Sequence, residues 1–114
     1  MKYFTIILML CLVLFSVNAF AAGGSGSRSV QHIQTSDIWF AVYPDTPFDN
    51  PDGCEDTSKV VFWTEDFPQG HSQLLSIAMS ALMSDKLASM WFSGCKLGVW
   101  GKTLPKAHTI KITK

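Results

Sequence analysis

The chain has 114 residues, 47% of them hydrophobic, and its nine basic and nine acidic side chains give a net charge of zero at pH 7. This length is enough for one domain, which excludes a two-lobed enzyme and a dinucleotide-binding fold. A chain without excess positive charge also lacks the attraction to phosphate groups on which nucleic-acid binding depends.

The N-terminal end of the chain has the composition of an export signal. Lys2 precedes an apolar run over residues 6–15, and Ala19-Phe20-Ala21 matches the small-residue pattern of a cleavage site. The run is too short to be a membrane span. We therefore expect a signal peptide at residues 1–21 and a secreted or periplasmic mature chain without a membrane span.

The mature chain is expected to begin with a flexible N-terminal segment, residues 22–35, followed by a folded domain at 36–114. Residues 23–29 carry no apolar side chain and are rich in Gly and Ser, which is typical of a flexible tail. Residues 30–35 allow two interpretations, a short strand or a continuation of the tail.

Two strands joined by a loop are expected next. Residues 38–43 are apolar on both alternating faces and predict a buried strand, and residues 59–63 predict a second strand. The segment between them, residues 45–56, contains prolines and predicts a loop. Its acidic side chains are Asp45, Asp49, Asp52, Glu55 and Asp56.

Residues 72–84 predict the single helix of the fold. One face has the spacing of a buried stripe, made of Leu75, Ala78, Met79 and Leu82. A second face carries serines every four residues, at 76, 80 and 84. Ser72 is expected to cap the helix, because its hydroxyl can accept a hydrogen bond from a free amide of the first turn.

Two further strands are expected after the helix. Residues 87–93 alternate, with Ala88, Met90 and Phe92 on one face, and this strand is expected to end at Gly94-Cys95. Residues 97–101 are glycine-flanked and too short for an assignment. Residues 108–114 alternate polar and apolar side chains and predict an antiparallel edge strand.

Two cysteines, Cys54 and Cys95, remain after cleavage, and in an oxidising compartment they are expected to form a disulfide. The bond would close a loop of about 42 residues and stabilise the domain by about 4 kcal/mol. A redox-active pair is disfavoured because no C-x-x-C motif is present, and a structural zinc site would need four ligands.

The order of elements predicts a mainly β fold with one helix (α+β), in the form of a small five-stranded, partly closed barrel with one disulfide. An open α+β sheet is the alternative. The four tryptophans of the chain are Trp39, Trp63, Trp91 and Trp100. Two or three are expected in the core, and Trp100, which lies between glycines, is the best candidate for an exposed binding residue.

Charge is divided along the chain. Eight of the nine acidic residues precede residue 67, and after Asp85 every charged residue is a lysine. Such a division allows two interpretations. Copies could attract one another head to tail and close into a ring, with the charges setting register more than affinity. Alternatively, the two charged regions are solvated surfaces without a partner.

Two other chemistries are disfavoured. The acidic loop could offer oxygens to calcium, but its spacing does not match an EF-hand loop, so we expect no metal and no cofactor. A hydrolase would need His32, His71 or His108, and no G-x-S-x-G motif is present. His71 is instead expected to help cap the helix, and we expect no enzymatic activity.

The run from Cys54 to Cys95 has the plan cysteine, strand, helix, strand and Gly-Cys. This plan resembles small exported bacterial proteins and, more distantly, the B subunits of the subtilase and pertussis type of five-B-subunit toxins, over residues 36–114. The resemblance implies an oligonucleotide/oligosaccharide-binding (OB) barrel, a pentameric ring and recognition of cell-surface glycans. In those subunits a serine at the start of the first long strand contacts sialic acid, and Ser36 is the matching position here.

The combined expectation is an exported, non-enzymatic binding module that recognises glycans through Ser36 and Trp100, with a pentameric ring as one of its two open assemblies beside a chain that does not associate. The alternative is a monomeric secreted or periplasmic protein that binds or inhibits another protein.

Overall fold

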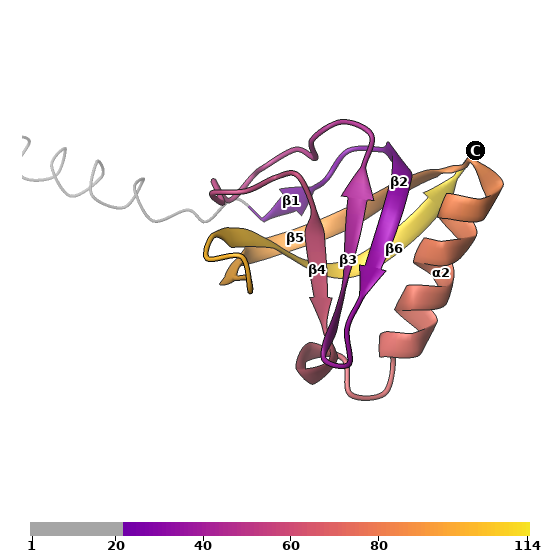
Figure 1. The fold of residues 1–114 in the computed structure, drawn as a ribbon. Coiled ribbons are helices and arrows are strands. Elements are labelled where there is room, and N and C mark those ends of the chain that lie inside the picture. Colours follow the sequence, from indigo (N-terminus) through magenta and orange to yellow (C-terminus); the bar gives the residue numbers. More distant parts are fainter. Residues whose placement is uncertain (1–21) are drawn as a thin grey trace, which may run out of the picture.

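The computed structural model describes residues 22–114, so the predicted signal peptide lies outside the described residues. The described chain is mainly β with one α-helix, which confirms the predicted mainly β class, and its sheet has six strands where five were predicted. The strands are β1 (Gly23–Gly24), β2 (Arg28–Thr35), β3 (Trp39–Pro44), β4 (Val60–Trp63), β5 (Leu87–Leu97) and β6 (Thr103–Thr113). A 3-10 turn, η1 (Thr64–Asp66), and the helix α2 (His71–Ser84) connect β4 to β5 (Figure 1).

Hydrogen-bonded pairing runs through the strands in the order β1-β5-β2-β3-β4-β6, and β6 also pairs with β5. The pairing of β4 with β6 is parallel, and the others are antiparallel. Three of these pairings are short. Gly23 and Gly24 of β1 lie opposite Phe92 and Trp91 of β5. Arg28 and Ser29 of β2 lie opposite Ala88 and Leu87 of β5, and β4 meets β6 at Val61 and Lys106.

The core lies between the sheet and α2. Alternate residues of β3 and β4, including Phe40 and Phe62, are fully buried here, and their rings stack with centroids 4.7 Å apart. The helix presents Ala78 and Ala81 to this core. These short side chains let the helix backbone lie close to the strands. The predicted buried strand at 38–43 is confirmed for residues 39–42, which are all buried, whereas Ile38 precedes β3 and is exposed.

The helix differs from its prediction in which face it buries. Leu75, Ala78 and Leu82 pack on the core as expected, but Met79 is exposed and Ala81 is buried in its place. The sequence contains two overlapping stripes of helical spacing. The one centred on the two alanines permits the closer approach to the sheet, so it is the one buried.

The predicted helix caps are wrong. The helix begins at His71 and no side chain caps it, because Gly70 occupies the capping position and places Ser72 inside the first turn. The amide of Leu74 bonds to the carbonyl of Gly70 at 3.1 Å. His71 does not cap either: its Nε2 lies 3.2 Å from the carbonyl oxygen of Phe62 and ties the helix start to β4.

The N-terminal segment is not the flexible tail that its composition predicts. Residues 28–35 form β2, which confirms the strand interpretation of residues 30–35, and Gly23–Gly24 pair with β5. Ser25 is fully buried, and its Oγ accepts a hydrogen bond from the amide of Met90 at 2.8 Å. Its own amide donates to the Met90 carbonyl at 2.8 Å. Backbone pairing and one buried hydroxyl thus anchor residues 23–29, which have no apolar side chains, while Val30 and Ile33 of β2 pack on the core.

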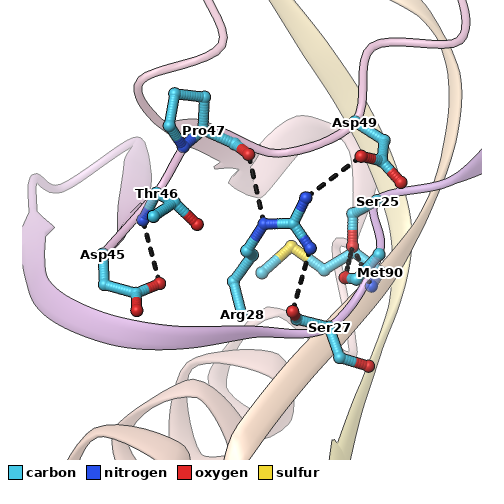
Figure 2. A network of polar contacts seen from close by, with 9 residues as sticks. Ser25, Ser27, Arg28, Asp45, Thr46, Pro47, Asp49 and Met90 are labelled. Atoms are coloured by element: carbon cyan, nitrogen blue, oxygen red, sulfur yellow. Dashed lines mark hydrogen bonds and ion pairs between the residues drawn. The ribbon is translucent and has the colours of Figure 1, made fainter.

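Arg28 fastens this segment to the acidic loop (Figure 2). Its guanidinium donates to the carbonyls of Pro47 at 3.2 Å and Ser27 at 2.9 Å, and to the carboxylate of Asp49 at 3.0 Å. The amide of Asp49 in turn donates to the carbonyl of Ser25 at 2.9 Å. The loop between β3 and β4 is therefore held at a fixed position over the N-terminal segment.

The predicted disulfide between Cys54 and Cys95 is confirmed, with Cα atoms 5.6 Å apart. Gly94 precedes the bridge in a left-handed conformation, with φ of 79°, at a point where the pairing of β5 with β6 shifts register. Glycine tolerates this conformation, and the resulting bulge lets β5 continue to Leu97 instead of ending at residue 94.

The last strand also differs from its prediction. It begins at Thr103 rather than at residue 108 and turns back along β5. It pairs with β4 at Lys106, so only its second half has a single strand neighbour as an edge strand would. The short stretch 97–101, which the sequence left unassigned, ends β5 and forms the turn between β5 and β6.

Replacing Ser25 with Ala should destabilise the fold by about 1–3 kcal/mol, because the buried amide of Met90 would lose its hydrogen-bond acceptor. Urea denaturation of residues 22–114 measures this difference. Ser27→Ala, at an exposed neighbouring position, serves as the control and should change stability by less than about 0.5 kcal/mol. Equal stability of Ser25→Ala and the wild type would contradict the anchoring role of this hydroxyl.

Replacing Cys95 with Ser should destabilise the fold by about 2–5 kcal/mol, because the open loop enlarges the unfolded ensemble. For a domain of this size the melting temperature should fall by roughly 10 °C or more. Wild-type protein melted in the presence of a reductant should match the variant. An unchanged melting temperature would show that the bridge adds nothing to stability.

Candidate binding site

The side of β3 and β4 that faces away from α2 carries aromatic side chains. Trp39, Ala41 and Tyr43 of β3 lie on this side with Val61 and Trp63 of β4. Outward faces of small antiparallel sheets are usually polar, so this composition is unusual. We call this surface the aromatic face, defined by Trp39, Tyr43, Lys59, Trp63, Lys96 and Trp100.

The turn between β5 and β6 covers part of the aromatic face. Trp100 from this turn lies edge-on to Trp39, with ring centroids 5.1 Å apart. A side chain at Gly98 would collide with Leu104, 2.6 Å from where its Cβ would lie, so glycine permits this close packing. Trp100 is exposed, as predicted, but it is fixed against β3 rather than free in a loop.

Lys59 is the buried cation of the aromatic face, with 8% of its surface exposed. Its ammonium lies 4.5 Å from the ring centroid of Trp100 and 5.4 Å from that of Tyr43, which is a favourable cation–π arrangement. It donates to the carboxylate of Asp56 at 3.1 Å. Partial burial of Asp56 opposes its ionisation. Hydrogen bonds from Ser58 and the charge of Lys59 outweigh this effect and lower the pKa of Asp56.

An open pocket of about 350 Å³ lies at the other end of the aromatic face. Its walls are Ile38, Trp63, Thr64 and Glu65. The volume is at the small end of the range for small-molecule sites, which is about 300–1,000 Å³. The amide of Thr64 bonds to the carbonyl of Ile38 at 2.9 Å, which joins the β2–β3 turn to η1 and fixes the shape of the pocket.

Charged groups border this pocket. The ammonium of Lys96 lies 4.7 Å from the centroid of the Trp63 ring and forms an ion pair with Glu65 and, at 3.5 Å, with Asp66. Partial burial disfavours the charged form of Lys96, but the two carboxylates outweigh it and raise the pKa of this side chain. The site therefore offers an indole wall, an aliphatic wall, a carboxylate and an ammonium group.

The predicted residue Ser36 lies two residues before the pocket residue Ile38, and Trp100 packs against Trp39, which pairs with the pocket residue Trp63 in the sheet. Ser36 is exposed in the turn between β2 and β3, where its amide donates to the carbonyl of Trp39 at 2.7 Å. Its hydroxyl donates to Asp37 at 2.9 Å. In the described part of the chain, residues 22–114, no hydrogen bond or ring contact joins Ser36 to Trp100.

The pocket residues were not predicted from the sequence. Trp63 and Glu65 lie together at the end of a predicted strand, which is the one local signal for a binding site. Lys96 is distant from both in sequence, so its position beside them could not be expected. Two of the four tryptophans, Trp39 and Trp63, pack in the interior as expected, and Trp91, at 50% exposed, is on the surface in addition to the predicted Trp100 at 40%.

The carboxylates of the acidic loop do not converge. Asp52 accepts a hydrogen bond from the amide of Gly94, Glu55 accepts one from the amide of Thr103, and each remaining carboxylate has a different orientation or partner. Among residues 22–114, no three His, Cys, Asp or Glu side chains are grouped closely enough to hold a metal ion.

The charge division of the sequence is partly neutralised within the fold. Lys96 and Lys106 come from the basic half, yet both pair with Asp66 of the acidic half. Asp49 and Asp56 have partners within their own half. Charge alone therefore gives a head-to-tail ring less support in the folded chain than in the sequence.

No protein-family model, curated protein or solved structure matches this chain. Over the described part of the chain, no helix combines the length and the apolar character that crossing a bilayer requires.

Replacing Asp56 with Asn should destabilise the fold by about 1–3 kcal/mol at pH 7, because the buried ammonium of Lys59 loses a charged acceptor. The pKa of Asp56 is lowered from 3.8 on folding, so its contribution is present above that value. The contribution is lost as the pH falls through the lower folded-state pKa. Denaturation at a series of pH values should show the two proteins converging in acid, and a difference that does not change with pH would contradict this assignment.

Proposed function

We propose that the mature chain is an exported, non-enzymatic binding module of the OB type that recognises cell-surface glycans. The strand order supports the fold assignment. Five strands pair in the sequence β5-β2-β3-β4-β6, β6 returns to β5, and the helix lies between β4 and β5. An OB fold is a five-stranded, partly open barrel of this kind, and it binds oligosaccharides on an outer face and its adjoining loops.

The observation that carries the proposal is the pocket at the end of the aromatic face. A pyranose ring has a CH-rich face that can stack on the indole of Trp63, and hydroxyls that can bond to the carboxylate of Glu65. The volume of about 350 Å³ suits one or two sugar rings. Such a ligand needs both an aromatic wall and charged acceptors, and this pocket supplies them together.

Ser36 supplies a further contact in this proposal. Its hydroxyl is exposed and now bonds to its neighbour Asp37, so it can turn to a ligand without breaking a buried contact. The resemblance to toxin B subunits makes sialic acid the first glycan to test. Lys96, which pairs with Glu65 at the pocket wall, is the nearby cation that a sugar carboxylate would meet.

A second candidate function is protein binding by a monomeric secreted or periplasmic chain. Leu97, Val99 and Trp100 are all exposed large side chains at the turn between β5 and β6. Apolar side chains gathered at one exposed site mark protein interfaces more often than isolated ones do. This patch could seat an apolar side chain of a target protein.

A glycan array of sialylated and neutral glycans, probed with the mature protein, separates the two functions. Ser36→Ala should weaken binding to the best glycan by about fivefold, the effect of one lost hydrogen bond. Trp63→Ala should abolish binding, because the stacking wall is removed. Trp91→Ala removes an exposed tryptophan that does not line the pocket, and it should bind as the wild type does.

Trp63 is half-buried, so its variant is compared with Ile38→Lys, which blocks the pocket from an exposed position. Loss of binding in both variants, with unchanged melting of Ile38→Lys, supports the pocket. The glycan proposal fails if the wild type gives no signal with any glycan. Capture of one defined protein, lost in Val99→Asp, would then support the second function.

A further inference from the structure

The outer face of α2 carries no charge. From His71 to Ser84 the helix contains no Asp, Glu, Lys or Arg, although one side of it is exposed to solvent. Surface helices normally place charged side chains on that side. Here the outward residues include Ile77, Met79 and Met83, which are 37%, 45% and 81% exposed. An uncharged exposed face with apolar side chains is costly in water and suited to a partner.

The shape of this helix face is complementary to a second copy of itself. Residues four apart form rows along a helix, and the serine row (Ser72, Ser76, Ser80 and Ser84) lies between Met79 and Met83 on one side and Ile77 on the other. The small serines form a groove, and the longer methionines form a ridge beside it. Two helices pack when the ridges of one enter the grooves of the other. A second copy of the same face offers both features.

The serine hydroxyls do not oppose such packing. Ser76, Ser80 and Ser84 each donate to the carbonyl four residues earlier, at 2.9, 2.9 and 2.6 Å. Burying an unpaired hydroxyl is costly, but these donors already have partners inside their own helix. Covering the groove at these three positions therefore leaves none of their hydroxyl protons without an acceptor.

Charges at the two ends of α2 favour an antiparallel partner. Asp37 lies near the N-terminal end, since the adjacent Ile38 bonds to Thr64 of η1. Lys86 and Lys114 lie beyond the C-terminal end with Asp85, because Leu87 pairs with Thr113, and Figure 1 shows the C-terminus beside that end. An antiparallel copy brings Asp37 of one chain toward Lys86 and Lys114 of the other, and it opposes the two helix dipoles.

We infer that the outer face of α2 is a self-association surface on which a second copy of this chain packs, with the two helices antiparallel about a two-fold axis. The interface is isologous: Met79 and Met83 of each copy enter the serine groove of the other. A helix of 14 residues is about 21 Å long, so the contact is small and the dimer is transient. This inference does not depend on glycan binding, because none of the pocket residues Ile38, Trp63, Thr64 and Glu65 belongs to α2, and the turn between β5 and β6 lies on the side away from α2 (Figure 1).

Sedimentation velocity of the mature protein, from about 10 μM to about 1 mM, tests the inference, since small interfaces dissociate in this range. The wild type should pass from monomer to dimer. Ser80→Arg places like charges at the centre of the interface and should remain monomeric throughout. Thr109→Arg, an exposed position on β6, is the matched control and should dimerise as the wild type does.

Two further measurements keep the test decisive. Met83→Glu, at the most exposed of the three apolar positions, should also be monomeric with an unchanged melting temperature, which separates loss of the interface from loss of folding. Ser80→Cys should form an intermolecular disulfide on mild oxidation, because Ser80 lies near the two-fold axis. A wild type that stays monomeric at the highest concentration, or a Ser80→Arg variant that still dimerises, overturns the inference, as does a five-membered ring.

Discussion

Burial of β3 on both faces is the constraint from which the rest of the molecule follows. Phe40 and Val42 point into the core under α2, while Trp39 and Ala41 point to the opposite side and are covered by the turn between β5 and β6. A strand buried on both sides needs a cover on each. The helix supplies one cover and a tryptophan-bearing turn supplies the other. The aromatic face and its pocket exist because the second cover is incomplete.

The small size of the domain explains its dependence on long-range ties. A chain of this length buries a smaller fraction of its surface than a larger domain does, so its net stability is a small difference between large terms. The disulfide joins the acidic loop to β5, and Arg28 joins the same loop to the N-terminal segment. Both ties act on the long loop between β3 and β4, which has no regular structure to hold it.

The glycan proposal and the self-association proposal use different parts of one scaffold. The pocket lies at the junction of the β2–β3 turn with η1, whereas the uncharged face belongs to the helix that follows. A module that binds one sugar weakly gains avidity when two copies bind together, provided that the geometry permits simultaneous contact. The transient dimer proposed for α2 would supply that second site without altering the pocket.

The sequence by itself determined the disulfide pair, the mainly β class, the helix and the two strands before it, because these depend on local periodicity and on the number of cysteines. Tertiary structure alone decided that residues 22–35 belong to the sheet and that Ala81 rather than Met79 is buried. It also decided that Lys96 meets Trp63 and Glu65. These outcomes depend on contacts between residues far apart in the chain, where a glycine or a serine is stabilised by a neighbouring strand. Local composition carries no information about such neighbours, so it could identify the elements but not the site that they form together.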